Sequence, residues 1–381
     1  MNGNLLSTPE GVGDTYGEEL FRKRKLEEKL LKTVSSFGYK EIETPVFEYF
    51  DVFSGEVGTT PSRELYKFFD KEGETLALRP DFTPSIVRFA AGLKHESDEP
   101  LRLTYHGKTF TNAISLQGRK HEVTQLGAEL MGDASEYADA EILGLIVNAF
   151  HEIGLTDFQI SIGNADFFRG LCEAAGLSDA EEEQLRGYVK SKNQVAARAM
   201  LTELSLKEDY SAILLRCTDL FGDFDSLVEA KNLLPKSDAP GLEKSRKALD
   251  RLQRVYDLLT PYDARSHIGF DLGLLSRYHY YTGLIFKGYT YGLGDAIVTG
   301  GRYDTLSSLF GKDMPAIGFA IVVDDLLHAL DYQHIDLGSA AETKLVRYSD
   351  KDYDALMRKV MEQRKQGLQV AACYLPEGSL E

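Results

Sequence analysis

The stretch RLTYHGKTFTNAISLQGRKHEVTQLGAELMG, residues 102–132, decides the fold. Its two ends, residues 102–110 and 122–132, mix β-forming and polar residues in partial alternation, which predicts two strands. The segment 111–121 between them is polar enough to form the loop of a hairpin. We therefore expect an antiparallel pair of strands here.

Further strands and amphipathic helices surround this predicted hairpin. Residues 16–36 repeat leucines at near-helical spacing, and a strand with a proline-bearing bend follows them. Residues 76–80 form a short apolar strand ended by proline, and residues 137–153 form another amphipathic helix. Strand-like sequence occurs again at 157–162 and from residue 268 onward. The pattern predicts an α+β core with one mainly antiparallel sheet.

Two segments differ from this pattern and divide the chain. Residues 165–262 are rich in Leu, Ala, Glu and Lys and show several helical patterns, so we expect a helical insertion domain. The core then comprises residues 1–164 and 263–332. Residues 333–381 read as strand, helix and strand, which predicts a small C-terminal α/β segment.

The composition limits the function classes. With 381 residues and a formal net charge of -17, the chain is a poor general nucleic-acid binder, although a local basic groove remains compatible with it. Cys172, Cys217 and Cys373 are too widely spaced for a disulfide framework or a metal site, so we expect buried or half-buried thiols. No apolar run reaches the ~20 residues that span a bilayer. We expect a soluble, cytoplasmic protein with neither metal nor cofactor.

Several polar residues occur where a plain sheet would not need them. Asp81 and Thr83 lie at the predicted turn from strand to helix. Gln125 and Glu129 share one face of the second hairpin strand, because strand side chains alternate with a period of two. The full set of candidate binding residues is Asp81, Thr83, Arg119, Gln125, Glu129, Tyr280 and Tyr281.

These residue types suit an amino-acid ligand. The carboxylates of Asp81 and Glu129 would bind an ammonium group, Arg119 or Gln125 would bind a carboxylate, and tyrosine hydroxyls would bind a polar ring such as imidazole. Each residue also has a structural interpretation. Asp81 could cap the following helix, Gln125 and Glu129 could lie on a solvated sheet face, and paired tyrosines could belong to the core.

Five segments, in order, resemble class II histidyl-tRNA synthetases between about residues 5 and 330. They are FGYKEIETPVFE (37–48), LALRPDFT (76–83), GRKHEVTQLGAELMG (118–132), HYYTGLIF (279–286) and TGGRYDTL (299–306). The resemblance implies the class II synthetase fold, an antiparallel sheet flanked by helices. The similarity of the first segment to motif 1 also implies a homodimer.

The chain departs from these synthetases at three arginine positions. Thr111 stands at the arginine of motif 2, Ser276 at the catalytic arginine of the first histidine signature, and Asp325 at the arginine of motif 3. Losing one such transition-state partner typically costs about 100- to 1000-fold in rate. We therefore expect no ATP-dependent activation of histidine and assign no catalytic residue.

A chain that retains the amino-acid pocket of these synthetases but lacks their catalytic arginines resembles the regulatory subunits of hetero-oligomeric ATP phosphoribosyltransferase. The resemblance implies a short-form catalytic subunit as partner, L-histidine as feedback inhibitor, and a homodimer within a hetero-oligomer that performs the first step of histidine biosynthesis. Two other interpretations remain open. One is an active histidyl-tRNA synthetase with divergent motifs, and the other is a stand-alone histidine-sensing protein.

Overall fold

The computed structural model describes residues 6–54, 60–93, 99–112, 120–275 and 281–375. The chain forms two compact units. The larger contains residues up to Asp14 and Lys23–Asp336, and the smaller contains Thr15–Arg22 and Leu337–Glu381.

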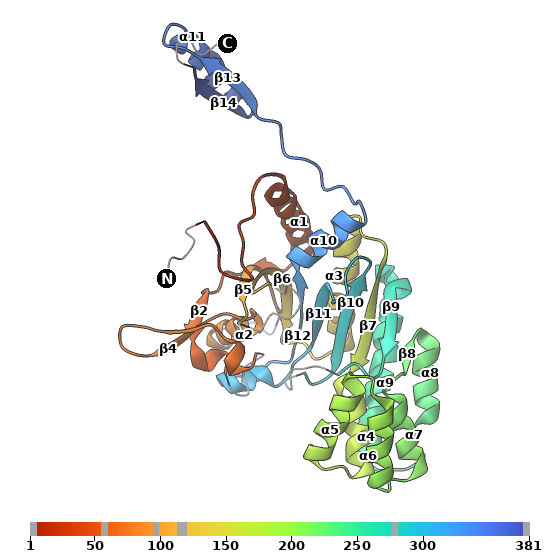
Figure 1. The fold of residues 1–381 in the computed structure, drawn as a ribbon. Helices are drawn as coiled ribbons and strands as arrows, with labels where there is room; N and C mark the ends of the chain where they lie inside the picture. Colours follow the sequence, from red (N-terminus) through yellow and green to blue (C-terminus); the bar gives the residue numbers. More distant parts are fainter. Residues whose placement is uncertain (1–5, 55–59, 94–98, 113–119, 276–280, 376–381) are drawn as a thin grey trace. The chain divides into compact units, whose positions relative to one another are not determined.

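A nine-stranded sheet forms the core of the larger unit (Figure 1). Its strand order is β1-β5-β6-β12-β11-β10-β7-β9-β8. The bounds are β1 Lys40–Glu41, β5 Leu101–Phe110, β6 Glu122–Met131, β7 Phe158–Asn164, β8 Phe221–Gly222, β9 Ile268–Asp271, β10 Leu284–Thr290, β11 Val298–Arg302 and β12 Ala316–Val322. β5 and β6 pair antiparallel along their whole length, from Leu101 opposite Met131 to Phe110 opposite Glu122. The predicted hairpin is confirmed.

The sheet differs from the prediction in three respects. Two pairs, β1 with β5 and β7 with β9, are parallel. β8 lies in the segment expected to be helical and extends the edge of the sheet. The short strand β4 (Thr75–Leu78) does not join the large sheet, because β2 (Phe47–Tyr49) and β3 (Lys67–Phe69) occupy both of its edges in a separate three-stranded sheet.

Helices of the core region bury apolar side chains. They are α1 Gly17–Ser36, α2 Thr83–Gly92, α3 Glu136–Glu152 and α10 Val323–Tyr332. Of these, α3 is buried around most of its circumference. In α3, Ser135 caps the N-terminus by accepting a hydrogen bond from the Ala138 N–H, and Leu143, Ile146 and Phe150 are fully buried. Each such side chain contributes about 1.5–3 kcal/mol of burial free energy. Single turns of 3₁₀ helix lie at Phe50–Val52, Ser62–Glu64, Thr260–Tyr262, Arg265–His267 and Leu306–Phe310.

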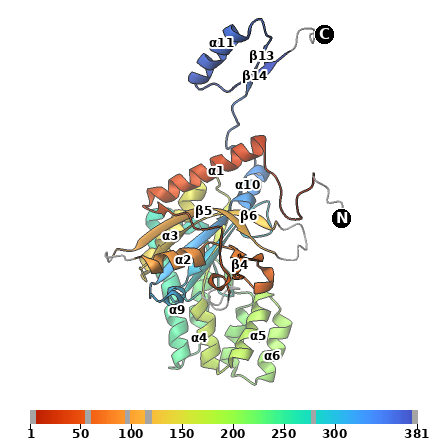
Figure 2. The same ribbon diagram turned by 90° about the vertical axis from the view of Figure 1, so that its left-hand side faces the viewer.

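Six helices follow β7 and gather at one end of the sheet (Figures 1 and 2). They are α4 Ala165–Ala175, α5 Asp179–Lys190, α6 Gln194–Glu203, α7 Glu208–Arg216, α8 Phe224–Leu233 and α9 Pro240–Leu258. α4 and α9 approach closely where Gly170 meets Gly241, since a Cβ atom at either position would lie 2.4 Å from the other residue's carbonyl oxygen. Any side chain here would separate the two helices.

The smaller unit contains β13 (Lys344–Tyr348), α11 (Tyr353–Lys365) and β14 (Val370–Tyr374). The two strands pair in parallel, as a strand–helix–strand connection requires. Cys373 on β14 is exposed, whereas Cys172 and Cys217 are buried. The expectation of three buried or half-buried thiols is therefore wrong for Cys373, because this two-stranded sheet leaves its side chain uncovered.

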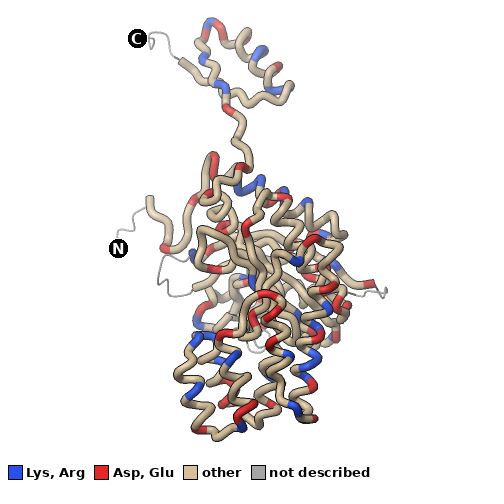
Figure 3. Tube along the Cα trace, turned by 90° about the vertical axis from the view of Figure 1, so that its right-hand side faces the viewer, with Lys and Arg blue, Asp and Glu red and all other residues tan. Residues whose placement is uncertain are grey.

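Acidic and basic positions are interspersed along the chain (Figure 3). Within the described ranges, no helix has the length and apolar character required to cross a membrane.

Candidate functional site

Glu129, near the end of β6, is a buried polar group of the candidate pocket. Its side chain is 1% exposed. Oε1 accepts a hydrogen bond from Thr83 Oγ1 at 2.8 Å, and Oε2 accepts one from the Tyr303 hydroxyl at 2.5 Å. Burial, together with the nearby Asp81, raises the pKa of Glu129 to about 8, despite the lowering effect of the two hydroxyl donors.

Two glycines make room for these side chains on the neighbouring strands. Glu129 lies opposite Gly318 on β12, and Gly318 lies opposite Gly301 on β11. A Cβ atom at position 318 would lie 1.5 Å from Glu129 Oε2, and one at position 301 would lie 2.8 Å from the Tyr281 ring. Glycine at positions 318 and 301 therefore leaves the space that the side chains of Glu129 and Tyr281 occupy, and any larger residue would fill it.

Asp81 supplies the second carboxyl group of the pocket. It lies in the turn between β4 and α2, where Oδ1 is shielded from solvent. The N-cap residue of α2 is Phe82, and Asp81 accepts a hydrogen bond from the Thr83 N–H. Burial raises the pKa of Asp81 to about 7. Two carboxyls with raised pKa values favour a ligand that brings positive charge or N–H donors.

Tyrosines form the walls around the carboxyl groups. The ring of Tyr105 on β5 stacks on Phe82 with centroids 4.3 Å apart, and its hydroxyl donates to the Phe319 carbonyl at 3.4 Å. Tyr281 is half-buried against the same apolar cluster. Burial, together with Glu129, raises the pKa values of Tyr105 and Tyr303 well above their ordinary range, so both remain neutral hydroxyls.

The structure brings Asp81, Thr83, Glu129 and Tyr281 into one neighbourhood. Gln125 lies four residues from Glu129, roughly 13 Å along β6. Its Oε1 is buried and has no hydrogen-bond partner among the described residues. Arg119 and Tyr280 lie outside the described residues.

Two pocket residues were missed by the sequence analysis, Tyr105 and Tyr303. Tyr303 lies in TGGRYDTL, one of the five synthetase-like segments, so that motif was an available signal. Tyr105 gave no such signal, because an aromatic residue within a strand is equally typical of a core position.

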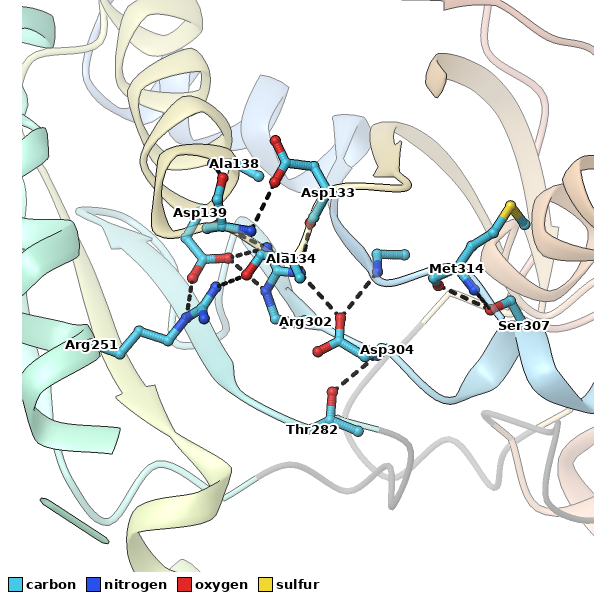
Figure 4. Close-up of polar contacts among 12 residues, drawn as sticks. Asp133, Ala134, Ala138, Asp139, Arg251, Thr282, Arg302, Asp304, Ser307 and Met314 are labelled. Atoms are coloured by element: carbon cyan, nitrogen blue, oxygen red, sulfur yellow. Dashed lines mark hydrogen bonds and ion pairs between the residues drawn. The ribbon is translucent and has the colours of Figure 1, made fainter. Parts of the chain in front are cut away.

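A buried ionic network fixes the segments that carry the tyrosines (Figure 4). Arg302, 2% exposed, donates from Nε to Asp139 Oδ1 at 2.8 Å. Arg251 of α9 donates from Nε to the other oxygen of Asp139 at 2.7 Å. Arg302 also pairs with Asp304 at 3.1 Å, and the Asp304 N–H donates to Thr282 Oγ1 at 2.9 Å. Arg302 and Asp304 thus hold the chain on either side of Tyr303.

Two of the three altered arginine positions can be located. Thr111 follows β5, and its N–H donates to the His121 carbonyl at 2.9 Å. Asp325 lies in the first turn of α10, where burial and the adjacent Asp324 raise its pKa. Asp324 accepts the Thr124 N–H at 2.6 Å and pairs with Lys23 at 2.8 Å. Ser276 lies outside the described residues.

The comparisons with known proteins agree with this geometry. The histidyl-tRNA synthetase family matches residues 11–326. The ATP phosphoribosyltransferase regulatory subunit of Acetivibrio thermocellus is 37% identical, over 95% of this chain and 85% of that protein. The chain belongs to the family of ATP phosphoribosyltransferase regulatory subunits. Another member, from Ruminiclostridium cellulolyticum, is 34% identical over 97% of this chain and 87% of its own length.

Solved structures give the same family. One described as an ATP phosphoribosyltransferase regulatory subunit or histidyl-tRNA synthetase, from Bacillus halodurans, has a TM-score of 0.86 and 30% identity over 99% of this chain and 94% of that chain. Histidyl-tRNA synthetase from Nostoc shares the fold, with a TM-score of 0.78 at 20% identity. The predicted fold class is confirmed. The prediction of a regulatory, non-catalytic subunit in histidine biosynthesis is confirmed at the level of the family.

Proposed function

We propose that this chain binds L-histidine in the pocket around Glu129 and thereby regulates a short-form ATP phosphoribosyltransferase catalytic subunit in the cytoplasm. The observation that carries the proposal is the buried carboxyl group of Glu129, which Thr83 and Tyr303 hold in place. A carboxylate kept at such a burial cost is typical of a functional site.

Histidine matches the groups around this carboxylate. An imidazole N–H would donate to Glu129, and the ammonium group would bind Asp81, whose raised pKa would fall as the cation arrives. Arg119 and the amide N–H groups of Gln125 are the proposed donors to the carboxylate of the ligand. Tyr280 and Tyr281 would enclose the ring.

A homodimer belongs to the same proposal. β2 and β3 present Phe47, Tyr49 and Phe68 on one face of the small sheet, with exposed fractions of 51%, 60% and 38%. Phe47 and Phe68 contact each other edge to face. Because monomers rarely expose such an aromatic group, this face next to the motif 1 segment supports pairing of two chains.

We expect the chain to form a stable complex with a short-form catalytic subunit when the two are co-expressed. The complex should turn over faster than the catalytic subunit alone, and histidine should slow it. Regulation of this kind requires a coupling free energy of typically about 1–3 kcal/mol between the two sites. Co-purification followed by a turnover assay with and without histidine measures both effects. Failure to form a complex would favour a stand-alone histidine sensor.

We expect no histidine-dependent exchange between pyrophosphate and ATP above background. Thr111 cannot neutralise an α-phosphate as an arginine does, and the carboxylates of Asp324 and Asp325 would repel a triphosphate. The exchange assay should include an authentic histidyl-tRNA synthetase as positive control. Robust exchange by this chain would establish the alternative of a divergent synthetase.

A further inference from the structure

A second cleft lies beside the pocket, at the junction of the helices and the sheet. Its volume is about 580 Å³. It is bounded by α9, the first turn of α3, the start of α4, and the segment Thr282–Gly283. This volume is within the usual range of roughly 300–1,000 Å³ for small-molecule sites.

One wall of the cleft is a row of cations on α9. Lys244, Lys247, Arg251 and Arg254 all line it. Their spacing of three, four and three residues places them on one face of the helix. Such a row is notable in a chain with a net charge of -17.

The carboxylates of the cleft are mostly paired with other cations. Asp166 pairs with Arg169 at 3.1 Å and Asp250 with Lys231 at 2.8 Å. Asp304 pairs with the buried Arg302. The remaining one, Glu136, lies in the first turn of α3, where the helix dipole stabilises its charge. Asp166 also interacts electrostatically with Lys244, whereas within the described residues Lys247 and Arg254 form no ion pair with these cleft carboxylates.

Three cations of the row are weakly held. Lys244 and Lys247 make only exposed ion pairs, with Glu173 at 2.6 Å and Glu243 at 3.7 Å. Exposed pairs of this kind contribute about 0–1 kcal/mol. Arg254 donates to the Tyr137 hydroxyl at 3.1 Å and has no carboxylate within ion-pair distance among the described residues. Within the row, Arg251 is the cation that forms an ion pair with a buried carboxylate, that of Asp139.

We propose that this cleft binds a small phosphorylated ligand through Lys247 and Arg254, with Lys244 as a third contact. A phosphoryl group carries the charge density that such cations favour, and a guanidinium binds it bidentately. The overall negative charge disfavours a long polyanion, which would contact the surrounding surface, whereas a small ligand contacts the cleft alone.

Calorimetric titration of inorganic pyrophosphate into the full chain at low ionic strength tests the proposal. We expect saturable binding that weakens as salt is added. The double variant Lys247→Ala, Arg254→Ala should bind at least about tenfold more weakly. The matched control Arg198→Ala, Lys207→Ala removes the same charge from exposed positions of the helical segment and should bind like wild type. A nucleoside triphosphate and a sugar phosphate, titrated in parallel, identify the group that accompanies the phosphate.

Three results would overturn the proposal. They are no pyrophosphate binding by the wild-type chain, equal affinity in the cleft variant, or the same loss in the control variant. Glu129→Gln should leave pyrophosphate binding unchanged, so failure of the cleft is distinguishable from failure of the histidine pocket.

Discussion

The difference in stability between the Glu129→Gln variant and wild type is expected to change by about 3 kcal/mol, in favour of the variant, as the pH rises from 5 to 8. The pKa of Glu129 is raised from 4.5 to about 8 in the folded protein. A raised folded pKa means that the carboxyl contributes its full stability below about pH 4.5 and loses it as the pH rises towards 8. Glutamine has no charge to bury, and its carbonyl still accepts a hydrogen bond.

Urea unfolding at pH 5 and pH 8 measures this difference in free energy of unfolding. Asp81 is present in both proteins, so its own titration largely cancels. Glu122→Gln, a half-buried position on the same strand that pairs with Lys108, is the matched control. Equal stability differences at the two pH values would contradict the assignment of Glu129 as a buried carboxyl with a raised pKa.

Replacing Asp139 by alanine is expected to destabilise the protein by about 3–5 kcal/mol. Asp139 is fully buried and accepts hydrogen bonds from both Arg302 and Arg251. Its removal leaves the guanidinium of Arg302, itself 2% exposed, with Asp304 as its remaining ion-pair partner. Histidine affinity should also fall, because Arg302 holds the backbone next to Tyr303.

The free energy of urea unfolding at pH 7 measures this loss. Arg251→Met is the informative comparison. It removes one arginine while Asp139 still pairs with Arg302, so the loss should be distinctly smaller. An Asp139→Ala protein as stable as wild type would show that the network does not support this end of the sheet.

Long elements with clear periodicity could be predicted from the sequence, and pairings between distant short strands could not. β5, β6 and α3 were recognised because alternation or helical spacing continues over ten or more residues. The parallel pairing of β1 with β5 was not predicted, because β1 contains two residues and carries no pattern. The separation of β4 into its own sheet depends on β2 and β3, which the local sequence does not specify.

The candidate pocket was predictable only in part, for the same reason. Asp81, Thr83 and Glu129 were found because charged or hydroxyl side chains in apolar segments are unusual. Arg302 and Asp304, in the last of the five synthetase-like segments, hold the backbone in the structure. The partner of Arg302, Asp139, lies 163 residues away within a helix. Nothing in the local sequence around Asp139 indicates that it pairs with an arginine so distant in the chain.

We propose that histidine binds to the buried carboxyl group of Glu129. Calorimetric titration of L-histidine into the wild-type chain and the Glu129→Gln and Glu122→Gln variants tests it most directly. Saturable binding by wild type and Glu122→Gln, with affinity at least about tenfold weaker in Glu129→Gln, is the predicted result, since a hydrogen bond to a charged group contributes about 1.5–3 kcal/mol. Absence of histidine binding by the wild-type chain, or equal affinity in all three proteins, would contradict it.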